Sequence, residues 1–387
     1  MNNFKIDKLP FYWRLASQND NSTNIVEDFY SFEFELNQKY GLLIQKRKED
    51  VLSSLTKIYK KNYNIGYFQD INLTNDIGKS YTKDFFDYLD KVLLQNSYIK
   101  KILEVGCGDC VILKNLMEKG YKVMGIDPGP LAYEAGIKKN IEVFTDFFPS
   151  LLIKEKVDLV FHVDVLEHIN NYEEFLRAQY ELLNENGVII VNVPDASDSF
   201  RMGDISLAMH EHLNYFTEDS LHNTLESIGF RDIMIKKSSY GGSLYAMGYR
   251  NKKIIVGNKS NEIDSYEKFT NNAKKNSVKF NEYIDNILSD NKKSLGFYVP
   301  LRALPYISMS PFIKGFRFFD DTPHWHHKFF DGIDVKIENF SDLKKDPVTD
   351  LIVMSLTFGE IIKNLVNNEF KGNINIISLN DLINHPI

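Results

Sequence analysis

The stretch ILEVGCGD at residues 102–109, with GID at residues 125–127, decides the fold expected for this chain. It begins with an apolar run that is typical of a buried parallel strand. Gly106 and Gly108 then allow a sharp turn and a close approach of the backbone to a ligand, because neither carries a Cβ. Residues 111–119 read as a helix, so the turn opens onto a helix N-terminus. The sequence therefore predicts a strand–turn–helix unit that binds a nucleoside.

An acidic residue follows at the end of the next predicted strand, residues 122–126. Asp127 lies about 20 residues beyond the glycines, where a carboxylate can accept hydrogen bonds from ribose hydroxyls. The dinucleotide fingerprint G-x-G-x-x-G is incomplete, because Val111 stands where its third glycine belongs. An ordinary α/β turn without a ligand is the alternative reading. Residues 143–148, 158–169 and 187–194 fit three further strands, and strands that alternate with helices predict a doubly wound parallel sheet.

The E-x-G-x-G pattern of Glu104, Gly106 and Gly108 resembles motif I of class I S-adenosylmethionine-dependent methyltransferases. Cys110 stands at the usual third glycine of that family. The resemblance implies S-adenosylmethionine as the cofactor, with Glu104 at its methionine end and Asp127 at its ribose. It also implies that Glu167 and His168 shape the cofactor pocket. Further cofactor contacts are expected from the ends of the third and fourth strands, namely Asp146, Phe147, His162 and Asp164.

Composition limits the class of protein. With 46 basic and 53 acidic residues the net charge is −7, which argues against a nucleic-acid substrate. No window reaches the roughly 18 apolar residues of a membrane span, and residues 1–7 lack the apolar core of a signal peptide. The two cysteines, Cys107 and Cys110, both lie in the glycine turn, so we expect a cytoplasmic protein without disulfides.

The length of 387 residues suits two or three domains. We expect a small N-terminal domain at residues 1–71 and the methyltransferase core at residues 72–250. One or two polar helices at residues 251–292 would link the core to a second α/β unit at residues 293–387. That C-terminal unit has no glycine-rich phosphate loop, so we expect it to bind substrate and no cofactor.

The candidate catalytic residues lie in MHEHLNYF, residues 209–216, after the fifth strand of the core. A histidine titrates near neutrality and suits proton abstraction, and an adjacent carboxylate can orient it. His210, Glu211 and His212 are therefore the candidates. The alternative, that they are surface or capping residues, stays open because spacing alone gives no geometry.

This stretch, together with GGS at residues 241–243, is similar to the nucleotide-sugar C-methyltransferase family, including the sugar 3-C-methyltransferases. The resemblance spans most of the chain, including the cofactor-free C-terminal unit. It implies that Glu211 and His212 lie at the sugar, with His212 as the base that removes a proton beside a ketone. The resulting enolate would take the methyl group. Tyr215 and Tyr240 belong to the same stretches and are expected to contact the substrate.

Two departures from that family leave alternatives open. The family begins with a zinc domain of C-x-x-C pairs, but Asn37 and Tyr40 occupy one such pair here, and no cysteine remains to bind zinc. Apolar packing must therefore hold this N-terminal domain together. Met209 stands where the family often has a tyrosine near the keto oxygen. O-methylation of a sugar hydroxyl therefore stays open, and so does a scaffold that binds the cofactor without turnover.

A second histidine-rich stretch, HWHHK, covers residues 324–328. Three histidines in four residues could bind a metal, but no cysteine or clear carboxylate motif completes a site, so we predict none. We expect Trp325 to stack on the nucleotide of the substrate and Lys328 to contact its charge. A solvated loop is the alternative.

By family analogy, the product would feed a surface polysaccharide or a glycosylated metabolite, and the sequence does not indicate an oligomeric state.

Overall fold

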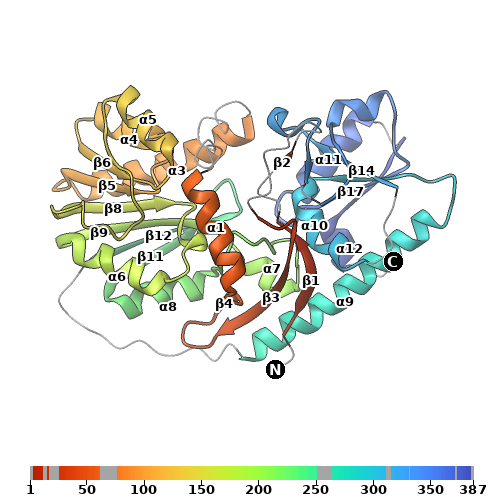
Figure 1. Ribbon diagram of the computed structural model, residues 1–387, viewed down its shortest axis with the longest axis horizontal. Coiled ribbons are helices and arrows are strands. Elements are labelled where there is room, and N and C mark those ends of the chain that lie inside the picture. Colours follow the sequence, from red (N-terminus) through yellow and green to blue (C-terminus); the bar gives the residue numbers. More distant parts are fainter. Residues whose placement is uncertain are drawn as a thin grey trace.

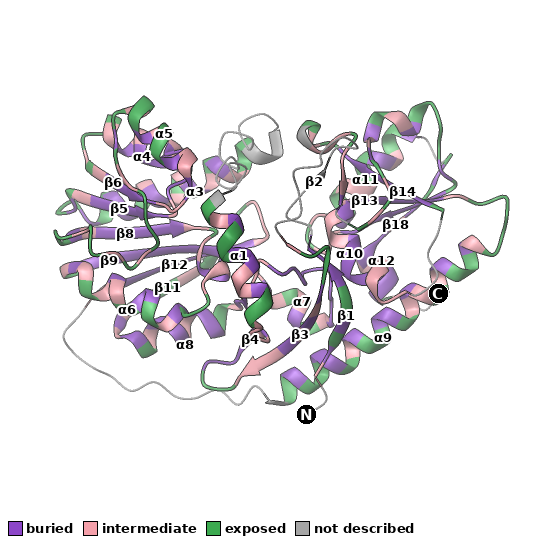
Figure 2. Ribbon diagram, viewed as in Figure 1, coloured by how far each residue is buried: buried purple, intermediate pink, exposed green. Residues whose placement is uncertain are grey.

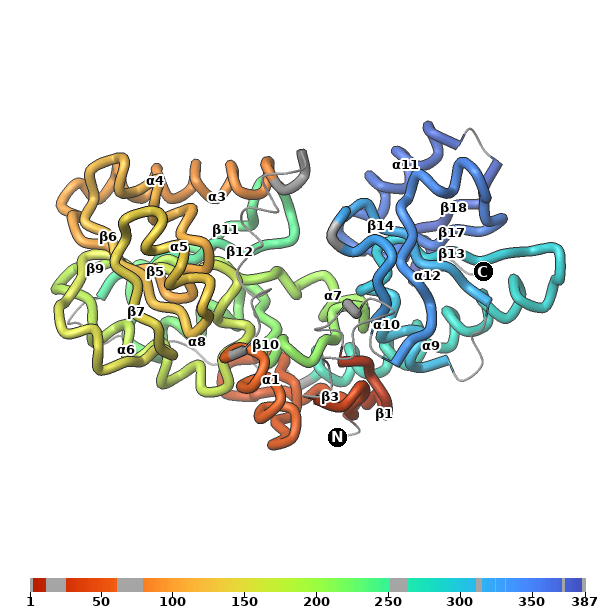
Figure 3. Tube along the Cα trace, turned by 45° about the horizontal axis from the view of Figure 1, so that its top comes forward, coloured from red at the N-terminus to blue at the C-terminus, as the bar shows by residue number. Residues whose placement is uncertain are grey.

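The computed structural model describes residues 3–11, 15–16, 26–61, 76–250, 263–310, 315–330, 332–370 and 373–384. Two lobes lie side by side, one built on a seven-stranded sheet and the other on the C-terminal sheet (Figure 1). The N-terminal strands and the first helix lie between them, and the view turned by 45° keeps this arrangement (Figure 3).

The larger sheet has the strand order β11-β12-β9-β8-β5-β6-β7. Strands β5 to β9 are parallel, which confirms the doubly wound sheet, whereas β12 pairs antiparallel with both β9 and β11. The chain leaves β5 toward β6 on one side and returns to β8 on the other, so the carboxyl end of β5 is a topological switch point. The strands are β5 (Lys101–Val105), β6 (Lys122–Ile126), β7 (Glu142–Phe144), β8 (Val157–Val163), β9 (Leu183–Pro194), β11 (Phe230–Lys237) and β12 (Ser243–Arg250).

Helices cover both faces of this sheet, and the buried strands lie between them (Figure 2). Because side chains alternate along a strand, Ile102 packs with the core of α3, α4 and α5, and Leu103 packs with the core of α6 and α8. The strands can therefore be apolar throughout, as the sequence predicted. The helices of this part of the chain are α3 (Asp76–Gln95), α4 (Val111–Glu118), α5 (Pro130–Lys139), α6 (Tyr172–Leu182) and α8 (Glu218–Ile228), with the short 3-10 helix η1 (Leu166–His168) and with α7 (Ser197–Met202), which packs against α9 (Ile263–Leu288).

A four-stranded antiparallel sheet joins the N-terminal segment to the larger lobe, because its last strand, β10 (Asn214–Tyr215), comes from the chain beyond β9. Aromatic packing holds this sheet, as expected: the Phe32 and Phe34 rings lie 4.7 Å apart. At the positions of the missing cysteine pair, Asn37 donates a hydrogen bond to the Tyr172 hydroxyl at 2.7 Å and Tyr40 is buried. The other elements of this segment are β1 (Lys5–Pro10), β3 (Phe29–Asn37), β4 (Leu42–Gln45) and α1 (Glu49–Lys61).

A single long helix, α9 (Ile263–Leu288), leads to the C-terminal sheet, whose five strands are parallel in the order β16-β14-β13-β17-β18. The second α/β unit expected from the sequence is present. The pair β2 (Leu15–Ala16) and β15 (Phe329–Phe330) connects it to the N-terminal segment. The remaining elements are β13 (Leu295–Tyr298), α10 (Pro300–Ser308), β14 (Phe316–Asp320), η2 (Pro323–Trp325), β16 (Ile337–Asn339), η3 (Phe340–Lys344), β17 (Asp350–Val353), α11 (Gly359–Phe370), β18 (Asn375–Ser378) and α12 (Leu379–Asn384).

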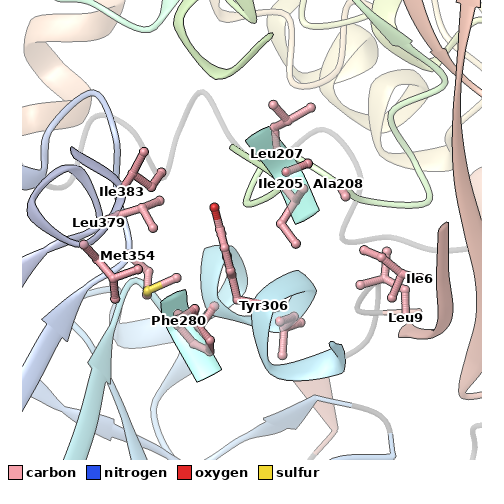
Figure 4. Close-up of a cluster of buried hydrophobic side chains, with 14 of the residues drawn as sticks. Ile6, Leu9, Ile205, Leu207, Ala208, Phe280, Tyr306, Met354, Leu379 and Ile383 are labelled. Carbon is pink, nitrogen blue, oxygen red and sulfur yellow. The ribbon is translucent and has the colours of Figure 1, made fainter. Parts of the chain in front are cut away.

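One hydrophobic core unites all three parts of the chain (Figure 4). Ile6 and Leu9 enter it from β1, Ile205 comes from the segment after α7, and Tyr306 comes from α10. The Tyr306 hydroxyl donates a hydrogen bond to Asp204 at 3.2 Å. This shared core fixes the C-terminal unit against the rest of the chain.

Candidate active site

A cavity of about 660 Å³ opens at the carboxyl edge of the seven-stranded sheet, beside the switch point. Its volume is in the range of small-molecule and cofactor sites. Its lining includes helices α1 and α3, the loops that follow β5 to β9, and two residues of the C-terminal unit, Leu301 and Trp325. The predicted site residues that line it are Gly106, Gly108, Asp127, Asp146, Phe147, Asp164, Glu211, His212 and Trp325.

The glycine turn has the close packing that its sequence implies. Gly106 has a φ of +74°, and a Cβ on it would lie 2.5 Å from Cγ2 of Val165. The Gly108 N–H donates to one oxygen of Asp127 at 3.1 Å, and the Gly129 N–H donates to the other at 2.7 Å. A carboxylate oxygen accepts more than one hydrogen bond, so Asp127 can still accept the two hydroxyls of a ribose. The turn and its acceptor therefore fit the nucleoside part of the expected cofactor.

Asp164 is fixed at the cavity by a residue that the sequence did not single out. It has a left-handed φ of +52° and accepts a hydrogen bond of 2.9 Å from the Tyr81 hydroxyl. Asn192 donates to the same hydroxyl at 3.0 Å. Burial raises the pKa of Asp164 to about 6, which still leaves a carboxylate near neutral pH. Tyr81 comes from α3, far from the glycine turn in sequence, so no local motif marks it.

Replacing Tyr81 with phenylalanine is expected to lower the affinity for S-adenosylmethionine by about 10-fold. The change removes one hydrogen bond to a charged acceptor, which is worth about 1.5 kcal/mol, and leaves the ring in place. Calorimetric titration with the cofactor checks this. Tyr133→Phe is the control, since the exposed Tyr133 on α5 does not line the cavity. Unchanged affinity in the Tyr81 variant would show that cofactor binding does not depend on the hydrogen bond from Tyr81 to Asp164.

Glu104 and His162 do not line the cavity, although the sequence placed both at the cofactor. Both are fully buried in the sheet. The His162 ring packs 5.4 Å from that of Phe175 on α6, and burial lowers its pKa to about 3. Alternation along β8 explains this position, because a residue just before the strand end points into a helix-covered face.

Glu211 and His212 lie on the loop before β10 and line the same cavity as the glycine turn. Nδ1 of His168 is 2.9 Å from the carbonyl oxygen of Glu211, and the rings of His168 and His212 are 4.9 Å apart. Burial and the nearby His168 and Arg302 hold the pKa of His212 well below its usual value. Burial raises the pKa of Glu211 to about 8, and the Arg302 charge partly opposes this. Arg302 lies on α10, and no sequence motif marked it as a residue of this site.

His210 points the other way and does not line the cavity. It is 1% exposed, its ring stacks 5.6 Å from that of Phe11, and its Nε2 donates to the carbonyl of Leu9 at 3.2 Å. Burial lowers its pKa to about 4. The structure therefore separates two histidines that spacing alone could not distinguish. His210 anchors the N-terminal sheet to the loop that carries Glu211 and His212.

Substitution of His210 by alanine is expected to lower the free energy of unfolding by about 2–3 kcal/mol, because it leaves a buried space and an unpaired carbonyl. Chemical denaturation measures this. Cofactor affinity of the folded variant should stay within about two-fold of wild type. A stable variant that binds the cofactor but does not turn over would contradict this purely structural role.

Three predicted substrate contacts do not line the cavity either. The Tyr215 hydroxyl accepts a hydrogen bond from the Met209 N–H at 3.3 Å and donates one to the Met209 carbonyl at 3.2 Å. These two bonds hold the loop that carries Glu211 and His212. The Tyr240 ring lies 6.0 Å from that of Tyr81 and 5.1 Å from that of Phe358. Lys328 is half-buried outside the cavity.

The histidine-rich stretch does not form a metal cluster in the part of the chain that the structure describes. Nε2 of His326 donates to the backbone carbonyl of Asp320 at 2.9 Å, and His327 is exposed. The side chain of His324 lies outside the described residues. Trp325, from the same stretch, lines the cavity.

Comparison with known proteins agrees with this geometry. Residues 78–234 match the family described as "Methyltransferase domain". The chain is 26% identical over 142 residues to the ubiquinone biosynthesis O-methyltransferase of Pelagibacter ubique, covering 33% of this chain and 56% of that one. It is 25% identical over 150 residues to the C-methyltransferase NovU of Streptomyces niveus, covering 37% and 36%. The chain thus spans about half or less of the curated relatives that it matches.

Among solved structures, magnesium protoporphyrin IX methyltransferase from Synechocystis PCC 6803 is 15% identical with a TM-score of 0.41. The match covers 52% of this chain and all of that one. No helix within the described ranges combines the length and the apolar character that crossing a membrane requires. The sheet, the glycine turn with Asp127, and the family match lead to one conclusion: residues 78–234 form a class I methyltransferase domain whose cofactor is S-adenosylmethionine.

Proposed function

We propose that this protein transfers a methyl group from S-adenosylmethionine to a nucleotide-activated sugar, with His212 as the general base. The observation that carries the proposal is the single cavity, which brings the glycine turn and Asp127 together with Glu211 and His212. Bound S-adenosylmethionine supplies an electrophilic methyl group, so the protein's tasks are to orient the acceptor and to remove its proton.

The cavity residues that come from the C-terminal unit favour a sugar nucleotide as the methyl acceptor. Leu301 and Trp325 line it from the C-terminal unit, and an indole ring there can stack on a base or a sugar face. We propose that the acceptor is a carbon beside a ketone, that His212 takes its proton, and that Glu211 helps to hold the sugar. The C-methyltransferase relative supports this choice. We place the reaction in the cytoplasm, on a route to a surface polysaccharide or a glycosylated metabolite.

O-methylation of a sugar hydroxyl is the second candidate. Met209 lines the cavity where a tyrosine donor would help an enolate, and a thioether has no hydrogen to donate. Several relatives of the methyltransferase domain are also named as O-methyltransferases. A hydroxyl acceptor would need only a base within reach, which His212 could provide.

Mass spectrometry distinguishes the two reactions. The protein is incubated in deuterated water with S-adenosylmethionine and a panel of keto and non-keto nucleotide sugars. We expect a keto sugar to gain one methyl group and to exchange hydrogen for deuterium beside the ketone. Methylation of a non-keto sugar without exchange would replace C-methylation by O-methylation. Cofactor binding with no product on any sugar would overturn the sugar proposal and favour a non-catalytic scaffold.

A further inference from the structure

Three side chains that line the cavity lie close to one another, although they come from two separate segments of the chain. Glu167 and His168 come from η1, and His212 comes from the loop before β10. One potential ligand atom from each lies within 4.8 Å of the others. Two imidazoles and one carboxylate form the donor set of many catalytic zinc sites and of non-haem iron sites. The sequence predicted no metal here, because His212 is far along the chain from Glu167 and His168 and joins them only in the folded protein.

The hydrogen bonding of His168 prepares it as a ligand. Its Nδ1 is 2.9 Å from the backbone carbonyl of Glu211, and a carbonyl oxygen only accepts, so Nδ1 carries a hydrogen. In the neutral ring, Nε2 then has a free lone pair. Metal-bound histidines commonly donate their other N–H to a carbonyl in this way, which fixes both the tautomer and the orientation of the ring.

The lone pair of His168 faces a carboxylate and not a donor. Nε2 of His168 lies 3.8 Å from Oε1 of Glu167, too far for a direct hydrogen bond. Glu167 is 2% exposed, and neither of its carboxylate oxygens has a hydrogen-bond partner among the described residues. A buried, unpaired carboxylate is costly. A cation between Glu167, His168 and His212 would satisfy all three.

We propose that Glu167, His168 and His212 bind a divalent first-row transition-metal ion whose open positions face the cavity. In such a site the open positions take water or a substrate oxygen. The ion would therefore hold an oxygen of the methyl acceptor, and this second part rests on the proposed function. The ion and a proton compete for the same lone pair of His212, so His212 is a ligand in the metal-loaded enzyme and can act as the general base only in the metal-free enzyme.

Titration of the metal-free, full-length protein with Co²⁺ tests the site without cofactor or acceptor. We expect one equivalent to bind, with visible absorption bands of a four- or five-coordinate ion. Glu167→Gln and His168→Gln should each weaken binding at least about 10-fold, as loss of a ligand requires. His326→Gln is the control, because it removes a ring nitrogen from the other histidine-rich stretch. Circular dichroism verifies that each variant is folded.

Absence of stoichiometric binding, or equal binding by wild type and both ligand variants, would overturn the metal site. Binding that is lost in the His326 variant would move the site to the other stretch. The acceptor part has its own readout: a nucleotide sugar that the enzyme methylates should shift the Co²⁺ bands. An unshifted spectrum would overturn that part. If no sugar is methylated, the proposed function fails while the metal measurement still stands.

Discussion

Gly106→Ala is expected to weaken binding of S-adenosylmethionine by about 100-fold or more. Gly106 has a φ of +74°, which an alanine adopts only at a cost of about 1 kcal/mol. The new Cβ would also lie 2.5 Å from Cγ2 of Val165, a side chain with little freedom to move away. Either the turn or the Val165 loop must shift, and both line the cavity. A 100-fold loss corresponds to about 2.7 kcal/mol, which these two effects together can supply.

Two further variants separate the backbone cost from the clash. Gly120 has a φ of +91°, and a Cβ on it would have no neighbour within 4 Å, so Gly120→Ala should cost some stability but leave cofactor affinity unchanged. In the double variant Gly106→Ala with Val165→Ala, the atom at 2.5 Å is gone and the remaining Cβ of Val165 is 3.7 Å away. That variant should recover part of the affinity. Wild-type affinity in Gly106→Ala alone would place the cofactor elsewhere.

The glycine turn was predictable because its information is local. Glycines that permit positive φ, an apolar run before them and an acidic residue after the next strand all lie within about 25 residues. The doubly wound sheet was predictable from the alternation of strands and helices along the chain.

The sequence could not reveal which way a side chain points, or which residues that are distant in the chain contact each other. His210 and His212 are two residues apart, yet one points into the aromatic core under β1 and the other into the cavity. Tyr81 reaches Asp164 from α3, and Arg302 approaches Glu211 from α10. These contacts depend on how helices pack against the ends of strands, which no short spacing encodes. The Glu167–His168–His212 cluster escaped prediction for the same reason.

His212→Ala is expected to lower kcat for the methylated nucleotide sugar by about 10²–10⁴-fold, the usual contribution of a positioned base. Affinity for S-adenosylmethionine should change little, because the contacts to the nucleoside come from the glycine turn and Asp127. Single-turnover kinetics and calorimetry measure the two quantities separately. His222→Ala on α8 is the matched control, since His222 does not line the cavity. Wild-type turnover in His212→Ala would refute the role of this residue as the general base.

Added imidazole then distinguishes the two ways in which His212 could serve the reaction. In the metal-free His212→Ala enzyme, free imidazole can enter the space left by the side chain and act as the base, so partial recovery of turnover supports direct proton abstraction. If His212 serves as a metal ligand, recovery should require the divalent ion together with imidazole. Together with Gly106→Ala, this variant separates the two ends of one cavity: loss of cofactor binding belongs to the glycine turn, and loss of turnover belongs to the loop of Glu211 and His212.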